Sequence, residues 1–283
     1  MIDLSRLGLT DEEISGVLFA KAHLTPSAAA VIEEGVSAYR AAPDFDYALL
    51  SERVAALTVP EEGQFLFILA LLPALEEYYE RKGYPKRWFE GVLQDTRVKL
   101  RECRAMTGRF GTICPSWFGR WFSLERIALE RLQFEPRRYD YSVTIGDWRF
   151  TGGELINVHI PGEGPLDHDA CLRSYAEAAR FYGGRFPGPY VPFQCNSWLL
   201  HPEHPAFLDP RSRILAFQAD YTIFDFKEKD PRDVVWRFTL SPWDGDPAHL
   251  PARNSLEKAY RDRILSGGSV GNGRGIYLYP KGN

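Results

Sequence analysis

The sequence predicts an α/β (α+β) protein in which a helical N-terminal part is followed by a part built on a mixed β-sheet. Residues 1 to about 110 carry helix start and stop signals at short intervals. From about residue 129, short runs of β-branched and aromatic residues dominate. One unit of strand, loop, helix and strand within residues 155–200 predicts a pair of parallel strands, because such a pair needs a crossover connection.

Four helices are expected in the first part, over residues 10–22, 25–40, 60–83 and 85–105. Thr10 with Glu13 three residues later is a capping-box pattern, in which each side chain bonds to the other residue's backbone N–H. Thr25 followed by Pro26 is typical of an N-cap with proline in the first helical position. The break at 108–115 predicts a junction, so we expect a helical domain over residues 1–115 and a second domain over residues 116–283.

The second part is expected to contain strands at 132–135, 141–145, 148–151, 155–160, 193–200, 214–226, 234–240 and 276–279. Gly146-Asp147 predicts a tight hairpin turn between the second and third of these strands. The long apolar run at 214–226 is expected to pair with 234–240 across a polar loop. Residues 255–265 are expected to form a short helix.

Composition and charge argue against several classes of protein. The net charge is −4 and the isoelectric point is near 5.9, whereas a nucleic-acid-binding surface needs a basic patch. The longest apolar run, residues 65–75, is too short to span a bilayer. The four cysteines form no Cys-x-x-Cys pair, and we interpret them as reduced thiols of a cytoplasmic protein. We therefore expect neither a nucleic acid nor a membrane as a partner.

The segment 155–184 holds the strongest functional pattern of the chain. Asn157 and His159 fall on one face of the expected strand, opposite its aliphatic residues. A loop rich in proline and glycine, residues 161–165, ends the strand, and a helix is expected from Asp167. Free backbone N–H groups at the start of that helix can bind an anion close to His159.

Three spaced blocks of the sequence resemble a family of GNAT-like acyltransferases with an all-helical N-terminal domain. The blocks are HIP at 159–161 with GPL at 164–166, CNSWLL at 195–200, and LPARNSL at 250–256 with GNGRGI at 271–276. The resemblance covers roughly residues 120–280. It implies a GNAT-like second domain that transfers an acyl group from a thioester donor, acyl-CoA or an acyl carrier protein, to an amine of a small molecule or peptide.

His159 is the candidate general base under this resemblance. Its imidazole would take a proton from the attacking amine, because an imidazole gains and loses a proton near neutral pH. Asn157 lies on the same face and would contact the substrate. The alternative for His159 is a buried ring that is hydrogen-bonded to a backbone carbonyl.

Two glycine-containing segments are candidates for binding the phosphates of CoA. The resemblance implies that Gly162-Glu163-Gly164 binds the pyrophosphate through backbone N–H groups, although Glu163 and nearby aspartates add negative charge. A simple turn is the alternative. Arg274 lies within a second run of glycines, residues 271–275, which is either a phosphate-binding loop or a glycine-rich turn. Its guanidinium is a candidate partner for a phosphate or carboxylate.

The block Cys195-Asn196-Ser197-Trp198 is expected on a strand. Cys195 and Ser197 would share one face, and Asn196 and Trp198 would share the other. The resemblance implies that this strand splays from the His159 strand, with the thioester between them. Cys195 or Ser197 would then donate a proton to the leaving thiolate, while Asn196 and Trp198 would contact the substrate. The alternative is a stretch of small residues packed under a helix.

Two other functions stay open. One is a small-molecule-binding protein that keeps the GNAT-like fold without catalysis. The other is a thioesterase in which Cys195 is the nucleophile and His159 its base. His201 and His204 have a spacing found in metal sites, but the prolines beside them disfavour a helix carrying both, so no metal is expected.

Overall fold

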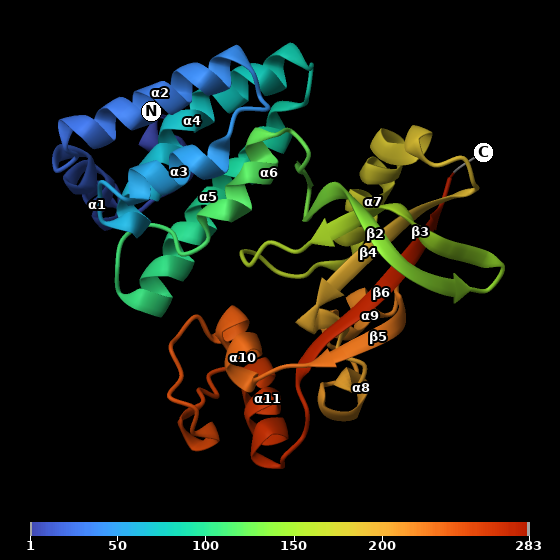
Figure 1. Ribbon diagram of the computed structural model, residues 1–283. Helices are drawn as coiled ribbons and strands as arrows, with labels where there is room; N and C mark the ends of the chain where they lie inside the picture. The colour runs from blue at the N-terminus through green and yellow to red at the C-terminus, as the bar shows by residue number, and fades with distance from the viewer. Residues whose placement is uncertain (1, 282–283) are drawn as a thin grey trace. The chain divides into compact units, whose positions relative to one another are not determined.

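The computed structural model describes residues 2–281, and the chain packs into two compact units that divide between Ala128 and Leu129 (Figure 1). The predicted order, with helices first and a mixed sheet second, is confirmed. Residues 116–128, which the sequence assigns to the second domain, pack within the helical unit. Trp117 and Trp121 both donate their indole N–H to the buried carboxylate of Asp95 in that unit.

The helical unit contains η1 (Leu4–Leu7), α1 (Asp11–Ala22), α2 (Pro26–Ala41), α3 (Tyr47–Ala55), α4 (Pro60–Arg81), α5 (Lys86–Thr107), η2 (Pro115–Phe118) and α6 (Gly119–Phe122). Helices α1, α2, α4 and α5 confirm the four predicted helices, whereas α3 was not predicted. The capping box is present at the start of α1. The backbone N–H of Glu13 donates to the Thr10 hydroxyl at 3.2 Å, and the N–H of Thr10 donates to the Glu13 carboxylate at 2.8 Å.

Helix α4 forms the centre of the helical unit, because most of its side chains between Phe65 and Leu75 are buried. Pro73 lies inside this helix and has no N–H, so the carbonyl of Leu69 loses its usual helical partner. The N–H of Ile2 donates to this carbonyl at 3.3 Å. The N-terminal segment therefore replaces the hydrogen bond that the proline removes.

The second unit contains strands β2 to β6 of a six-stranded sheet with the order β1-β2-β3-β4-β6-β5, and the short β1 spans the division between the units (Figure 1). The strands are β1 (Ile127–Leu129), β2 (Leu132–Ile145), β3 (Trp148–His159), β4 (Tyr190–Ser197), β5 (Thr222–Glu228) and β6 (Gly271–Pro280). The helices and turns between them are α7 (His168–Tyr182), η3 (Gly183–Arg185), η4 (Trp198–Leu200), α8 (His204–Phe207), α9 (Arg213–Gln218), α10 (Pro231–Thr239), η5 (Pro247–His249) and α11 (Ser255–Leu265).

The pairing of strands follows two of the sequence predictions. Strands β2 and β3 form an antiparallel hairpin that turns at Gly146-Asp147. Each is one long strand, where the sequence predicted shorter pieces. Strand β3, helix α7 and strand β4 form the predicted crossover unit, and β3 and β4 are parallel. The carboxyl end of β3 and the start of α7 therefore lie on the same side of the unit as the carboxyl end of β4.

Helix α7 packs against one face of the sheet, which we call the α7 face. The ring of Tyr175 in α7 contacts Phe134 of β2, Phe193 of β4 and Tyr277 of β6, with centroid distances of 5.9, 5.1 and 4.9 Å. Side chains alternate between the two faces along each strand. The residues between these aromatic positions point to the opposite face, which we call the His159 face.

The strand prediction at 234–240 is wrong, and the one at 214–226 is correct only for residues 222–226. Residues 214–226 form helix α9 and then strand β5, and residues 234–240 lie mostly in helix α10. Ser212 caps α9, while Asp230 caps α10 with Pro231 in its first turn. Short apolar runs fit a buried helix as well as a strand, and these caps decide the outcome. Strand β5 consequently pairs with β6 and not with residues 234–240.

The glycines at 271–275 lie within strand β6, so the expectation of a loop or turn there is wrong. A Cβ atom at Gly273 would overlap the carbonyl oxygen of Leu200, and one at Gly271 would overlap that of Lys227. Glycine is needed at these positions because two backbone segments approach the strand closely. Arg274 therefore projects from a strand and not from a phosphate-binding loop.

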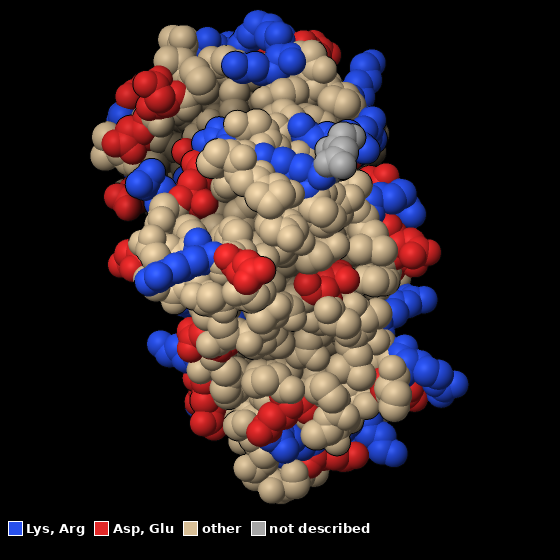
Figure 2. All heavy atoms as spheres, turned by 90° about the vertical axis from the view of Figure 1, so that its right-hand side faces the viewer, with Lys and Arg blue, Asp and Glu red and all other residues tan. Residues whose placement is uncertain are grey.

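Charged side chains of both signs are interspersed on the face of the molecule seen in Figure 2. Within residues 2–281, no helix combines the length and the apolar character that crossing a membrane requires.

Candidate active site

Strands β3 and β4 separate near their carboxyl ends. Their register consists of two pairs, Ile156 with Phe193 and Asn157 with Gln194. Beyond these pairs, β3 continues to His159 beside β2, while β4 continues beside β6. The splay that the family resemblance implies is therefore present, and His159 stands on its β3 side.

His159 meets a buried carboxylate. Its side chain is 19% exposed, and its Nε2 lies 3.1 Å from Oε1 of Glu135, whose side chain is 1% exposed. The amide nitrogen of Asn157 lies 2.9 Å from the same ring nitrogen. Glu135 on β2 is the register partner of Asn157 on β3, which is why the three groups meet. A carboxylate beside an imidazole orients the ring and favours its protonated form, so the pair suits proton transfer.

A chain of hydrogen bonds continues from Asn157 across the His159 face. The hydroxyl of Tyr139 lies 2.9 Å from Oδ1 of Asn157 and also contacts Oε1 of Gln194 on β4. Gln194 is 1% exposed. Burial raises the pKa of Tyr139 well above its usual value, so the hydroxyl keeps its proton. The network thus links the two strands on either side of the splay.

The loop between β3 and α7 is anchored by a residue that sequence reasoning missed. Arg131 donates from Nε to the carbonyl of Pro165 at 2.8 Å and from Nη2 to that of Pro161 at 3.0 Å. These two carbonyls flank Gly162-Glu163-Gly164. Arg131 lies in the turn directly before β2, far from the loop in sequence, which is why the sequence did not indicate it. Its guanidinium holds the two ends of the loop together.

One backbone N–H group at the start of α7 is already bonded within the protein, so it is not available to an anion. Asp167 is the N-cap and accepts the N–H of Ala170 at 2.8 Å, so the helix begins where the sequence predicts. Gly162 and Gly164 are exposed, and Gly164 has a φ of +85°, which favours glycine. Both a turn and a ligand-binding loop need this backbone shape.

Cys195 lies on the α7 face and not with His159. It is fully buried, and burial raises the pKa of its thiol to about 12. Ser197 lies on the same side of the strand by alternation, and its hydroxyl accepts the N–H of Leu199 at 3.2 Å. The structure therefore does not bring the thiol and the imidazole together.

The three other candidate residues are Asn196 and Arg274, which lie on strands, and Trp198, which does not. Asn196 is exposed, and it is the register partner of Arg274. Arg274 lies 3.8 Å from Asp225 and 5.2 Å from the ring centre of Tyr141. Both Asn196 and Arg274 occupy positions on the His159 face.

Trp198 follows the end of β4 in the turn η4, so its expected place on the strand is wrong. Its ring packs 5.2 Å from Phe238 and 5.8 Å from Tyr260, measured between centroids. These contacts make it part of the packing around α10 and α11.

His201 and His204 are both fully buried and serve packing contacts. Nε2 of His201 lies 3.0 Å from the carbonyl of Ser269, and Nε2 of His204 lies 2.7 Å from the hydroxyl of Tyr260. Across residues 2–281, no cluster of three or more His, Cys, Asp or Glu side chains suits a metal ion.

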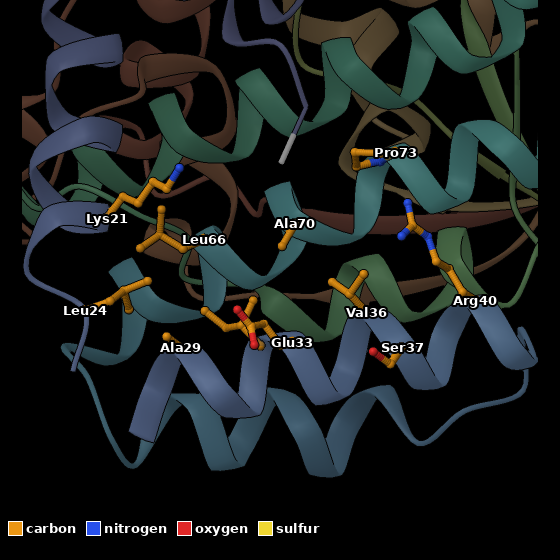
Figure 3. A pocket seen from close by; sticks show the side chains of 11 residues that line it. Lys21, Leu24, Ala29, Glu33, Val36, Ser37, Arg40, Leu66, Ala70 and Pro73 are labelled. Carbon is orange, nitrogen blue, oxygen red and sulfur yellow. The ribbon is translucent and has the colours of Figure 1, made fainter. Parts of the chain in front are cut away.

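A separate hollow of about 520 Å³ lies in the helical unit. Figure 3 shows side chains of α2 and α4 around it, including Arg40 of α2, together with Lys21 of α1 and Leu24. None of the titratable groups described above lines it, and the guanidinium of Arg40 already bonds to Glu77 at 3.0 Å. The candidate active site therefore lies on the His159 face.

Solved structures share this fold. A crystal structure of an acyltransferase in complex with decanoyl-CoA is similar at 23% identity and a TM-score of 0.75, covering 98% of this chain and 86% of that chain. An acyltransferase in complex with CoA and 10C-teicoplanin is similar at 20% identity, with the same TM-score and coverage. No curated protein sequence matches the chain.

Two family descriptions together match nearly the whole sequence. Residues 4–124 match the N-acyltransferase N-terminal domain, and residues 127–277 match the GNAT-like C-terminal domain. The second match alone spans more than half of the chain. The chain therefore belongs to the GNAT-like N-acyltransferase family in which a helical domain precedes a GNAT-like domain.

Proposed function

We propose that the protein transfers an acyl group from acyl-CoA to an amine, with His159 as the general base. The observation that carries this proposal is the imidazole of His159 at the splay of β3 and β4, with the buried carboxylate of Glu135 at 3.1 Å from its ring. Family membership supports an N-acyl transfer, and the site supplies a group that can accept the proton of an amine.

The reaction balances with this one residue as proton carrier. His159 accepts a proton from the amine as the amine nitrogen forms a bond to the thioester carbon. The carbon–sulfur bond then breaks, CoA leaves as a thiolate, and the protonated imidazole returns the proton to sulfur. The products are an amide and a thiol, so neither an external acid nor an oxidant is needed. The carboxylate of Glu135 favours the protonated imidazole while it holds the proton.

The donor and acceptor are proposed from the neighbouring structures. Those acyltransferases were crystallised with decanoyl-CoA, octanoyl-CoA and teicoplanin. We propose a medium-chain acyl-CoA as donor and an amine of a small molecule or peptide as acceptor. An acyl carrier protein is the alternative donor. We also propose a cytoplasmic location, supported by cysteines that form no disulfide among the described residues.

Calorimetry with acetyl-CoA, octanoyl-CoA, decanoyl-CoA and free CoA tests the donor. We expect micromolar binding that strengthens with chain length, because each buried CH₂ group adds about 0.8 kcal/mol. His159→Ala should keep this binding and lose transfer to amines in an assay of thiol release. His249→Ala, which changes an exposed imidazole of the same unit, is the control and should keep both.

Two results would count against the proposal. Absence of binding to every acyl-CoA would point to a carrier-protein donor. Tight binding without transfer to any amine, glycopeptides included, would favour the non-catalytic small-molecule-binding protein. The acidic residues around the phosphate loop, Glu163, Asp167 and Asp169, are the observation that keeps this second function in the test.

A further inference from the structure

Nε2 of His159 has two neighbours with opposite requirements. The amide nitrogen of Asn157, 2.9 Å away, is a donor and needs a lone pair on Nε2. The carboxylate oxygen of Glu135, 3.1 Å away, is an acceptor and needs a hydrogen on Nε2. One ring nitrogen cannot offer both at once, so one of the two contacts has to change.

The hydroxyl of Tyr139, the next group in this hydrogen-bond network, also cannot satisfy both of its neighbours at once. It carries one hydrogen but faces two acceptors, Oδ1 of Asn157 and Oε1 of Gln194. Turning the Asn157 amide by 180° exchanges its oxygen and nitrogen without changing its shape. Its Oδ1 then faces Nε2–H of His159 and its Nδ2 donates to Tyr139. The tyrosine hydrogen then goes to Gln194, so Tyr139 no longer faces two acceptors, and Nε2–H of His159 is shared between Oδ1 of Asn157 and Oε1 of Glu135.

Burial gives the orientation of the Asn157 amide and the tautomer of His159 a large effect on the energy of the site. Glu135, Asn157 and Gln194 are 0%, 8% and 1% exposed, so water does not replace a missing partner. A buried polar group without a partner costs about 1–3 kcal/mol, and more when it is charged. Glu135 also lies 3.6 Å from the guanidinium of Arg137, whose positive charge favours the ionised carboxylate. Nε2–H of His159 supplies a donor to this ionised carboxylate.

We propose that Glu135 fixes His159 in the tautomer with hydrogen on Nε2, supported by Asn157, Tyr139 and Gln194, so that Nδ1 is the atom that takes the proton. Glu135 is then a positioning residue. The opposite tautomer would leave the ring's lone pair on Nε2, between Glu135 and Asn157, where a substrate amine cannot reach it. The tautomer does not depend on the proposed function, whereas the role of Nδ1 as base rests on it.

Nitrogen NMR of the full chain tests the tautomer without any substrate. Long-range ¹H–¹⁵N spectra distinguish Nδ1–H from Nε2–H, and the His159→Gln spectrum identifies the signals of this residue among the six histidines. We expect Nε2–H in the wild type. In Glu135→Gln, the new amide can donate to the ring, so the signals should move toward Nδ1–H. Nδ1–H in the wild type, or a spectrum that Glu135→Gln leaves unchanged, would overturn the proposal.

Kinetics tests the consequence for the reaction. Glu135→Gln should lower kcat by about 10²-fold or more while KM for acyl-CoA changes little, because loss of the base's correct tautomer affects proton transfer and not binding. Glu154→Gln is the matched control, since this carboxylate bonds to Arg185 and should leave kcat unchanged. An unchanged kcat in folded Glu135→Gln would overturn the positioning role.

A second variant keeps the test usable if Glu135→Gln does not fold. Tyr139→Phe removes the hydroxyl that joins Asn157 to Gln194 and leaves the carboxylate in place. We expect kcat to fall roughly tenfold, with mixed tautomer signals for His159, because the amide of Asn157 is no longer held in one orientation. If His159 kept its wild-type tautomer signals in Tyr139→Phe, the hydrogen bonds from Tyr139 to Asn157 and Gln194 would have no role in positioning the ring. Failure of the proposed function would appear separately, as absence of acyl-CoA binding.

Discussion

The two faces of the sheet use the same strands for different purposes. On the α7 face, Phe193 and Cys195 are fully buried against aromatic rings that include Tyr175. On the His159 face, Gln194 lies between them in sequence and is equally buried, but it is held by the hydroxyl of Tyr139. Equal burial therefore has two meanings. Reducing the volume of Phe193 is expected to lower stability, whereas changing the hydrogen bonds of Gln194 is expected to alter the site.

The largest expected effect is on stability, at the α7 face. Phe193→Ala should lower the free energy of unfolding by about 3–5 kcal/mol, because it leaves a cavity between Tyr175 and Phe134. Urea unfolding measures this. Phe193→Leu should lose less, because more of the volume is kept. At a temperature where the variant is folded, kcat should stay within a few-fold of wild type, and a larger loss of kcat would contradict the separation of the faces.

Two histidines in different surroundings extend the comparison to the dependence of stability on pH. His159 has a carboxylate beside it, whereas His204 is fully buried against Tyr260 and near His201. Burial and then the charge of His201 lower the pKa of His204 to about 3. An unfolded histidine has a pKa near 6.5, so the contribution of His204 to stability is complete above that pH and is lost as pH falls from 6.5 toward 3.

The expected loss from His204 at pH 5 is about 2 kcal/mol, which is about 1.4 kcal/mol for each pH unit below 6.5. Urea unfolding at pH 7.5 and pH 5 measures it. His204→Gln cannot titrate at this position, so its stability should fall by about 2 kcal/mol less than that of the wild type over the same interval. Equal pH dependence in the two proteins would show that His204 has the same pKa in the folded and the unfolded chain.

Several of these residues could be placed from sequence, and others could not. Caps such as Thr10 and Thr25 act on neighbours three residues away, so the sequence was sufficient to predict them. Strand alternation also predicted that His159 and Asn157 share a face. Glu135 escaped prediction because its contact depends on the register of β2 against β3, and an irregularity between Tyr139 and Ser142 shifts that register.

Arg131 escaped prediction for a related reason, because it reaches the loop at 161–165 from the turn before β2. Residues 214–221 were predicted wrongly because apolar and β-branched side chains suit both a strand and a short buried helix. In each case the missing information was tertiary. Local signals predicted where elements begin, while pairing between distant segments decided which side chains meet.

A smaller effect, on the KM for acyl-CoA, is expected at Arg131, which bonds to the loop after the carboxyl end of β3. Arg131→Gln should raise KM for acyl-CoA about tenfold, or about 1.4 kcal/mol, because the carbonyls of Pro161 and Pro165 lose their charged donor. An acyl-pantetheine thioester lacks the diphosphate, so its KM should not change. Arg173→Gln is the control, since this arginine pairs with Glu130 and is 60% exposed. Equal changes for both donors would show that Arg131 acts on folding and not on phosphate binding.

The smallest effect is expected at Cys195, where the comparison of faces meets the thioesterase hypothesis. Cys195→Ala should cost about 1 kcal/mol of stability and leave transfer activity unchanged, because the thiol lies on the α7 face. With a thiol pKa of about 12, only about one molecule in 10⁵ is a thiolate at pH 7. Iodoacetamide should therefore label the partly exposed Cys114 before Cys195. Selective labelling of Cys195 with loss of activity would move the chemistry to the α7 face and support the thioesterase.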